Sequence, residues 1–294
     1  MKANAAKPTA RIEDALERAL SFACASSAPP QLAAAVRHAV MPGGARVRPR
    51  LCIAVSAACG DDAPQLTDAA AAALELLHCA SLVHDDMPCF DDAATRRGRA
   101  SVHAKFGAPL ALLTGDALIV LAFETLARAG LEQPGRLGPL TMAVSGAVGM
   151  PAGITAGQGW ESEADVPMDL YHRAKTGALF IGAVKAGAIA AGSDPNRWTA
   201  FGDRLGEAYQ VADDLRDAAG DAEDLGKPVG QDAALGRPNA VAKLGLSGAL
   251  SRMETLVRGA IDAIPDCPGA SMLEALMRSE AKRLVPAQLA QSAA

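Results

Sequence analysis

Aromatic residues are scarce in this chain of 294 residues. They make up 3% of it, with two Trp and two Tyr, although half of all residues are hydrophobic. Ala and Leu fill the long apolar segments instead, and β-branched residues are sparse there. Because Ala and Leu favour helices whereas β-branched and aromatic residues favour strands, the composition predicts an all-α fold.

Other absences exclude further classes of protein. The six cysteines include no CxxC pair, which is typical of small buried or reduced thiols in a cytoplasm rather than of a disulfide framework. No apolar run reaches the roughly 18 residues of a membrane span, since the longest candidate, 143–157, is interrupted by Gly and Pro. The charged N-terminal region lacks a signal-peptide core. With a net charge of -5, we expect a cytoplasmic protein with no membrane span and no nucleic-acid partner.

Helical spacing divides the chain into a series of segments. The expected helices are 11–26, 31–40, 48–58, 66–86, 115–129, 140–159, 169–191, 198–217, 239–246, 249–264 and 271–283. The segment 66–86 is apolar nearly all round, so it should lie in the middle of a bundle. Residues 1–10 are expected to be disordered, and 218–238 to form a Gly- and Asp-rich loop. Since no linker interrupts the rest, 11–294 should be one domain.

Two clusters of aspartates each follow a long apolar, helix-patterned run. The first is Asp85-Asp86-Met87-Pro88-Cys89-Phe90-Asp91-Asp92, and the second is Asp213-Asp214-Leu215-Arg216-Asp217. Carboxylates three or four residues apart share a helix face and repel one another unless a cation offsets their charge. Mg2+ binds one or two carboxylates and completes its coordination with waters and substrate phosphates. Two clusters on facing helices would therefore make a cage for a diphosphate.

Basic residues accompany both clusters. They are Arg46, Arg48 and Arg50 before the first, Arg96 and Arg97 after it, Lys175 between the two, and Lys227 after the second. A lone DDxxD string is more often a solvated helix end, and a lone Lys is more often a surface charge. The combination favours a phosphate site, because Arg offers a planar fork to phosphate and Lys a point charge.

The segment from His78 through Asp85 and Asp91 to Arg96-Arg97-Gly98-Arg99 resembles the first aspartate-rich motif of the trans-polyprenyl diphosphate synthases, and 206–217 resembles the second. Further landmarks follow in the family's order: Gly43-Gly44-Ala45-Arg46-Val47-Arg48-Pro49, Gly157-Gln158, Lys175-Thr176-Gly177-Ala178-Leu179 and Leu225-Gly226-Lys227-Pro228. The resemblance extends from about Arg37 to about Lys243. Its closest subgroup is the bacterial geranylgeranyl diphosphate synthases of carotenoid pathways.

This resemblance implies a single all-α bundle with a deep central cavity. It also implies a homodimer that uses Mg2+, three ions per active site, to condense isopentenyl diphosphate with allylic diphosphates (dimethylallyl, geranyl or farnesyl) head to tail. The implied metal ligands are Asp85, Asp86, Asp91, Asp213, Asp214 and Asp217, with Asp214 and Asp217 either ligands or positioned behind them. Catalysis would fall to Asp85, Asp91 and Asp213, with Lys175, Lys227 and Arg96 gripping the departing diphosphate.

Isopentenyl diphosphate would lie against Arg48, His78 and Arg97. His78 precedes Asp85 by seven residues, about two turns along the same helix face, which favours a ligand over a buried core histidine. Thr176 and Gln210 would lie near the allylic cation.

Three motif positions depart from the family pattern. Ala45 replaces a Lys that normally helps to hold isopentenyl diphosphate, and the adjacent Arg46 need not point the same way. Arg237 keeps the charge of a second expected Lys. Glu161 stands where the family usually has Asp, and receives a weak role.

Ala80 and Ser81 bear on product length. Ser81 lies one turn before Asp85 on nearly the same face, and in the family a bulky aromatic at these positions stops elongation early. Small residues here imply geranylgeranyl diphosphate as product, unless they merely allow helices to pack. The alternatives are a farnesyl diphosphate synthase, a non-catalytic partner subunit, which Ala45 favours, and a metal-dependent diphosphate hydrolase, which would leave the isopentenyl site idle.

Overall fold

The structure is a computed structural model that describes residues 8–219 and 239–284. Its α-helices are α1 (Pro8–Ala23), α2 (Pro30–Val40), α3 (Val47–Cys59), α4 (Pro64–Asp85), α5 (Val102–Phe106), α6 (Ala108–Gly130), α7 (Pro134–Val148), α8 (Ile154–Trp160), α9 (Met168–His172), α10 (Ala178–Ala190), α11 (Thr199–Ala219), α14 (Ala240–Asp262) and α15 (Ala270–Leu284). A π-helical turn, Arg173–Gly177, joins α9 to α10, and a 3-10 turn, Pro195–Trp198, precedes α11. The all-α prediction is confirmed.

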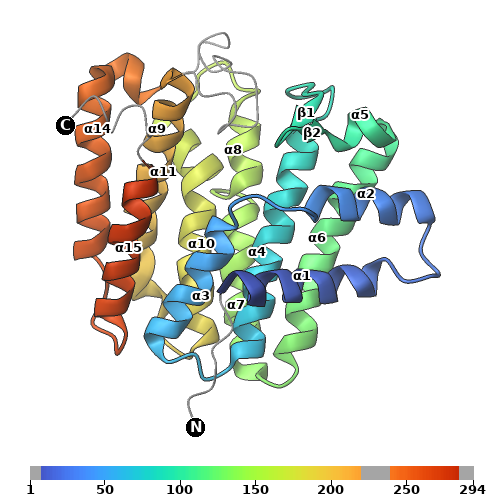
Figure 1. The fold of residues 1–294 in the computed structure, drawn as a ribbon, viewed down its shortest axis with the longest axis horizontal. Coiled ribbons are helices and arrows are strands. Elements are labelled where there is room, and N and C mark those ends of the chain that lie inside the picture. The colour runs from blue at the N-terminus through green and yellow to red at the C-terminus, as the bar shows by residue number, and fades with distance from the viewer. Residues whose placement is uncertain (1–7, 220–238, 285–294) are drawn as a thin grey trace. The chain divides into compact units, whose positions relative to one another are not determined.

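The chain forms two compact units. Unit 1 consists of Met1–Val144 and Lys185–Asp194, and unit 2 of Ser145–Val184 and Pro195–Ala294. Unit 1 is organised around α4, which packs against α1, α3 and α6; Figure 1 shows α4 and α6 side by side. Most of the buried side chains of α4 between Leu66 and Leu77 are Ala or Leu, as expected of a helix in the interior of a bundle. The prediction of a buried central helix over 66–86 is therefore confirmed.

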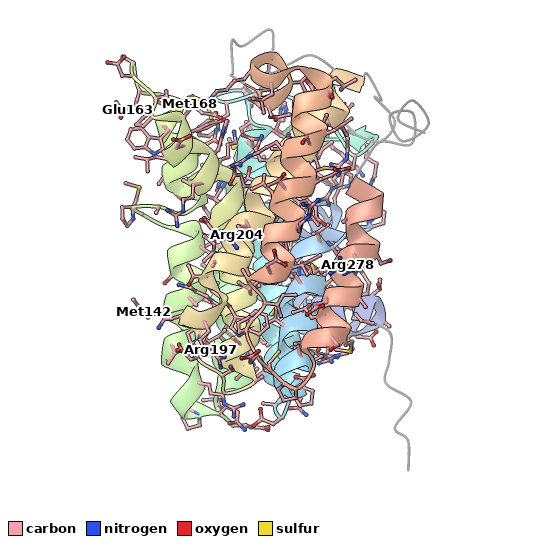
Figure 2. The ribbon with its side chains drawn as sticks, turned by 90° about the vertical axis from the view of Figure 1, so that its left-hand side faces the viewer. Met142, Glu163, Met168, Arg197, Arg204 and Arg278 are labelled. Carbon is pink, nitrogen blue, oxygen red and sulfur yellow. The ribbon has the colours of Figure 1, made fainter. Side chains whose placement is uncertain are left out.

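Unit 2 is organised around α11 and α14, which lie side by side in Figure 1. Val211 and Leu215 of α11 pack with Met253 and Leu256 of α14 in one apolar cluster. At the edge of this pair, Arg204 of α11 donates to the carbonyl of Gly259, with 2.6 Å between Nη1 and O (Figure 2). The packing fixes the end of α11, where the second aspartate cluster lies.

By length and composition, two of the described helices, both in unit 1, could cross a membrane, although polar residues interrupt both apolar stretches. They are α4 and α6. In the apolar stretch of 18 residues that each helix contains, 78% is buried in α4 and 39% in α6. Thr114 and Asp116 interrupt the apolar run of α6. We interpret α4 as a core helix, whereas α6 keeps an apolar face exposed.

Several predicted boundaries are wrong. The expected helix 140–159 is two helices, because Gly149, Pro151 and Gly153 fall between Val148 and Ile154. α1 begins at Pro8 and α6 at Ala108, earlier than expected. The predicted break near 246–249 is a kink within α14 at Gly245, whose φ is 69°. Residues 1–7 and 220–238, most of the predicted disordered and loop segments, lie outside the described residues.

One short element was not expected at all. Strand β1 (Thr95–Arg96) pairs antiparallel with β2 (Arg99–Ala100), and Arg96 lies opposite Arg99. The two-residue turn between them, Arg97-Gly98, has positive φ at both positions, 54° and 70°. This is the backbone of a type I′ hairpin turn, which matches the twist of its strands. The hairpin presents the arginines that follow the first aspartate cluster.

Candidate active site

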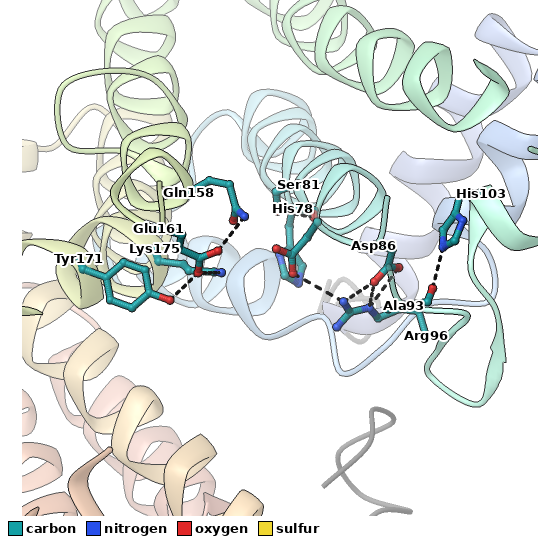
Figure 3. A network of polar contacts seen from close by, with 11 residues as sticks. His78, Ser81, Asp86, Ala93, Arg96, His103, Gln158, Glu161, Tyr171 and Lys175 are labelled. Atoms are coloured by element: carbon teal, nitrogen blue, oxygen red, sulfur yellow. Dashed lines mark hydrogen bonds and ion pairs between the residues drawn. The ribbon is translucent and has the colours of Figure 1, made fainter. Parts of the chain in front are cut away.

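The first aspartate cluster lies in a loop that folds back on the end of α4. Pro88 cannot continue the helix with a backbone hydrogen bond, and the loop amides bond instead to the last turn. The amide of Asp91 donates to the carbonyl of Asp85 at 3.0 Å, and the amide of Ala93 donates to that of Asp86 at 3.1 Å. His103 bonds the carbonyl of Ala93 at 2.9 Å (Figure 3). The loop thereby returns Asp91 to the end of the helix that carries Asp85.

Arg96 compensates the negative charge of this cluster. Its Nε lies 2.9 Å and 3.2 Å from the two carboxylate oxygens of Asp86, and its Nη2 lies 3.6 Å from Asp85 (Figure 3). Burial raises the pKa of Asp86, although Arg96 opposes the shift. Burial alone would lower the pKa of Arg96, but Asp86, Asp85 and Asp91 raise it. Three of the four aspartates are thus within the field of one guanidinium.

The two side chains of the pair Asp85-Asp86 differ in their exposure to solvent. The Asp86 side chain is 4% exposed and is held by Arg96, whereas that of Asp85 is 16% exposed. Within residues 8–219 and 239–284, no group of three or more His, Cys, Asp or Glu side chains is arranged to hold a metal. Mg2+ does not require such a group, because one or two carboxylates suffice when a substrate supplies phosphate oxygens. Asp85 and Asp91 fit that requirement, because both are carboxylates and the loop brings Asp91 back to the end of the helix that carries Asp85.

A second feature of unit 1 is the group of Arg48, His78 and Arg97. Arg48 lies 3.3 Å from His78, measured between Nη1 and Nε2, and the guanidinium can only donate, so the imidazole nitrogen accepts. Burial, Arg48 and Arg97 all lower the pKa of His78, which is therefore neutral. Arg97 lies against Gly44, where a Cβ atom would be 2.8 Å from the guanidinium carbon. Arg48 and Arg97 thus both lie close enough to His78 to affect its pKa, and all three residues were predicted to hold isopentenyl diphosphate.

The side chain of Arg46 is bound by residues outside this group. Its Nη1 bonds Glu75 at 2.7 Å, its Nε bonds Glu13 at 2.8 Å, and its Nη2 bonds the carbonyl of Val40 at 2.9 Å. The residue is buried and has a left-handed backbone, with φ at 50°. Ala45, by contrast, is exposed. Arg46 therefore stabilises the packing of α1 and α4 and does not replace the cation that Ala45 lacks.

The two positions predicted to set product length differ in environment. Ala80 is 1% exposed and belongs to the core of unit 1. Ser81 is half-buried, and its hydroxyl donates to the carbonyl of His78 at 2.8 Å (Figure 3). A larger side chain at Ala80 must displace packed atoms, whereas one at Ser81 has more room. Their role in product length stays a prediction.

In unit 2, the second cluster lies on the last turns of α11. The Asp213 side chain is 54% exposed and pairs with Arg216, one turn along the helix. Asp214 is buried, accepts a hydrogen bond from Gln210 at 3.0 Å, and accepts another from the amide of Ala240 at 2.7 Å. Asp217 is also buried. Again the first carboxylate of the pair is the more exposed one.

The hydroxyl of Thr176 extends the contacts of Gln210. It lies 2.6 Å from the amide oxygen of Gln210 and donates to it. Thr176 lies in the π-helical turn and Gln210 in α11, so the bond joins the two segments. The structure therefore brings together two residues that were predicted to lie near an allylic cation.

Lys175, the neighbour of Thr176, contacts a different carboxylate. Its Nζ pairs with Glu161, which also accepts from the Tyr171 hydroxyl at 2.6 Å and from Gln158 at 3.0 Å (Figure 3). The ammonium also lies 5.8 Å from the centre of the Tyr171 ring. Glu161 thus accepts from three donors. Its role in the site is larger than the weak role expected from the sequence.

Sequence reasoning missed Tyr171 and His103. Tyr171 stands four residues before Lys175, a spacing that puts both on one helix face and could have identified it. His103 carries no such signal, because its partner is a carbonyl of the aspartate loop. The predicted Lys227 and Arg237 lie outside the described residues.

Known proteins are similar to this chain over most of its length. The family described as polyprenyl synthetase matches residues 29–263, which include parts of both units. The chain is 57% identical to the geranylgeranyl diphosphate synthase of Cereibacter sphaeroides, over 95% of the chain and 97% of the relative. It is 50% identical to the enzyme of the same name from Rhodobacter capsulatus, over 94% and 95%.

Solved structures agree with the sequence matches. A geranyltransferase of Helicobacter pylori, complexed with magnesium and isoprenyl diphosphate, superposes with a TM-score of 0.77. Its sequence identity is 29%, and the match covers 96% of this chain and 99% of that one. The similarity to this structure and to the two relatives covers nearly the whole chain.

Proposed function

The chain belongs to the polyprenyl synthetase family, and we propose that it is a geranylgeranyl diphosphate synthase. The observation that carries the product assignment is the 57% identity to a relative of that name over nearly all of both chains. The reaction is the head-to-tail condensation of isopentenyl diphosphate with an allylic diphosphate. Enzymes of this family depend on Mg2+; three ions per active site are part of the proposal.

In unit 1, Asp85 and Asp91 would hold Mg2+, and Arg96 would bind the diphosphate that leaves the allylic substrate. Bound Mg2+ supplies Lewis-acid stabilisation of that leaving group. Asp86 holds Arg96 in place through its paired hydrogen bonds. Arg48, His78 and Arg97 would bind isopentenyl diphosphate, which has no leaving group in this step and needs charge rather than metal.

In unit 2, Asp213 would hold Mg2+, and Lys175 and Lys227 would bind the departing diphosphate. Preorganised cations of this kind act on charge that grows in the transition state. Thr176 and Gln210 would place oxygen atoms near the allylic carbon that becomes positive. The single family match across 29–263 supports the proposal that 11–294 is one catalytic domain.

The test is product analysis. The purified chain, incubated with isopentenyl diphosphate, farnesyl diphosphate and Mg2+, should yield geranylgeranyl diphosphate, identified by chromatography after removal of the diphosphate. Growth from dimethylallyl diphosphate that stops at farnesyl would favour the farnesyl synthase. Release of diphosphate without condensation would favour a hydrolase, and no turnover at all would favour a non-catalytic subunit.

We also propose a cytoplasmic homodimer that supplies a carotenoid pathway. The subgroup resemblance supports the pathway. The exposed apolar face of α6 supports the dimer: it carries Leu112, Leu113, Ile119 and Val120, all exposed. A two-fold dimer would bury the same face of both copies. Leu113→Glu combined with Val120→Glu should give monomers in sedimentation, whereas Met272→Glu, at an exposed position on α15, should not. A monomeric wild-type chain would contradict the dimer.

A further inference from the structure

The π-helical turn Arg173–Gly177 carries two adjacent residues that face different partners. The turn is defined by the amide of Ala178, which bonds the carbonyl of Arg173 five residues earlier. Such turns are rare and often lie at functional sites. Lys175 contacts Glu161, which follows α8, and Thr176 contacts Gln210 of α11. The exact path of this backbone therefore decides whether both contacts are made together.

Two glycines lie against this turn from two different helices. A Cβ atom at Gly157 of α8 would be 2.5 Å from the amide nitrogen of Lys175 and 2.6 Å from its Cα. A Cβ atom at Gly206 of α11 would be 2.8 Å from the Cα of Gly177. Both glycines are buried, and the atoms they approach belong to the backbone rather than to flexible side-chain ends. No larger residue fits at either position unless the turn moves.

We propose that Gly157 and Gly206 are positioning residues that fix the π-helical turn, so that Lys175 and Thr176 face their partners at once. The inference rests on the proposed function for the part that Lys175 and Thr176 play in turnover. The contact of Gly157 is with the backbone of Lys175 itself, and the contact of Gly206 is with Gly177, one residue after Thr176. The backbone is thus held at Lys175 and at Gly177, on either side of Thr176.

The chain offers matched controls for both positions. Gly159 lies on α8, two residues after Gly157, is exposed, and a Cβ atom there would meet nothing within 4 Å. Gly202 lies on α11, one turn before Gly206, and a Cβ atom there would lie 2.9 Å from the Cα of Ile181. Gly202→Ala therefore disturbs the packing of α11 against α10, beyond the turn. It separates a general loss of packing from a specific displacement of the turn.

The experiment measures amide hydrogen exchange and steady-state kinetics on the full-length variants. Gly157→Ala and Gly206→Ala should accelerate exchange over 173–178, because local opening then costs less free energy. Each should lower kcat by about 100-fold, the effect expected of a displacement near 1 Å, while the KM for isopentenyl diphosphate changes little. Gly159→Ala should leave exchange and kcat unchanged. Gly202→Ala should lower the melting temperature and accelerate exchange near Ile181, with kcat nearly retained.

Two results would overturn the inference. One is unchanged exchange over 173–178 in both Gly157→Ala and Gly206→Ala. The other is a loss of kcat in Gly202→Ala equal to that in Gly206→Ala, which would mean that packing alone matters. Failure of the proposed function is distinct: a wild-type chain that forms no prenyl product would refute the assigned reaction, and exchange would still decide whether the glycines fix the turn.

Discussion

The two aspartate motifs open with the same pair, but they restrain its second member differently. In unit 1, Asp86 is held by the charged guanidinium of Arg96. In unit 2, the described partners of Asp214 include two amide donors, the side chain of Gln210 and the backbone of Ala240. In both motifs this second carboxylate is buried, while the first is more exposed. Adjacent helical residues point in different directions, so one of a pair can serve structure while the other faces a ligand.

The largest expected effect comes from the exposed members of the pairs. Asp85→Ala or Asp213→Ala should lower turnover by roughly 1,000-fold or more, because the charge of the leaving diphosphate loses several kcal/mol of stabilisation. Circular dichroism should show an intact fold. Asp92→Asn, at an exposed neighbour with no assigned role, is the control and should stay active. Near-normal turnover in either folded alanine variant would contradict the interpretation of these residues as metal ligands.

The buried members should differ from each other in stability. Asp86→Asn removes the carboxylate that Arg96 contacts most closely, although Asp85 stays within 3.6 Å of the guanidinium, and should cost about 2 kcal/mol, the range of a hydrogen bond between charged groups. Asp214→Asn turns one of the two acceptor oxygens into a donor, so it loses one of the two amide hydrogen bonds, and should cost about 1 kcal/mol. Denaturant unfolding with a chelator present measures both free energies without a contribution from metal. Equal losses would mean that the two motifs restrain their second carboxylate in the same way.

A smaller effect should follow from adding a cation to unit 1. Ala45→Lys should lower the KM for isopentenyl diphosphate about 10-fold, since one charge-assisted contact contributes roughly 1.5 kcal/mol or more. Ala45 is exposed, so a lysine side chain can extend from this position without displacing packed atoms. Arg46 is bound to Glu13 and Glu75 and does not already supply the missing charge. Ala45→Gln, nearly as long but uncharged, is the control. An unchanged KM would show that other groups already fill this role.

The smallest change in rate is expected for product length. Ser81→Phe should yield farnesyl instead of geranylgeranyl diphosphate, with little loss of the first condensation, because an added ring occupies space that the last isoprene unit needs. Ala80→Phe should act similarly, but overpacking of its buried position should also cost about 1–3 kcal/mol of stability. Ser81→Ala should keep the longer product. If both phenylalanine variants stay active and still make geranylgeranyl diphosphate, the cavity ends elsewhere.

The sequence predicted the features that depend on local pattern. The apolar periodicity of 66–86 and the position of Pro88 placed the first aspartate cluster at the end of a buried helix, as the structure has it. The family motifs supplied the order of the charged residues. Each of these signals is carried by residues that are neighbours in the sequence, so one chain is enough to detect it.

The contacts that cross long stretches of chain could not be predicted. Arg46 pairs with Glu13 and Glu75, which are 33 and 29 residues away, and no helix-spacing rule connects them. Glu161 and Lys175 are 14 residues apart and meet only because a break and a π-helical turn separate α8 from α10. The hairpin has two residues per strand, too few for an alternating pattern to emerge. Tertiary packing decides each of these.

The hydrogen bond from Thr176 to Gln210 has a direction, and that direction has a consequence. A hydroxyl owns one proton, and Thr176 gives it to the Gln210 oxygen. Gln210 is kept in that orientation because its nitrogen donates to Asp214, a carboxylate that only accepts when ionised. The lone pairs of the threonine oxygen are then the part of the hydroxyl left to face a substrate. A side chain that ordinarily serves as both donor and acceptor becomes an acceptor alone, suited to a carbon that turns positive and unable to protonate it.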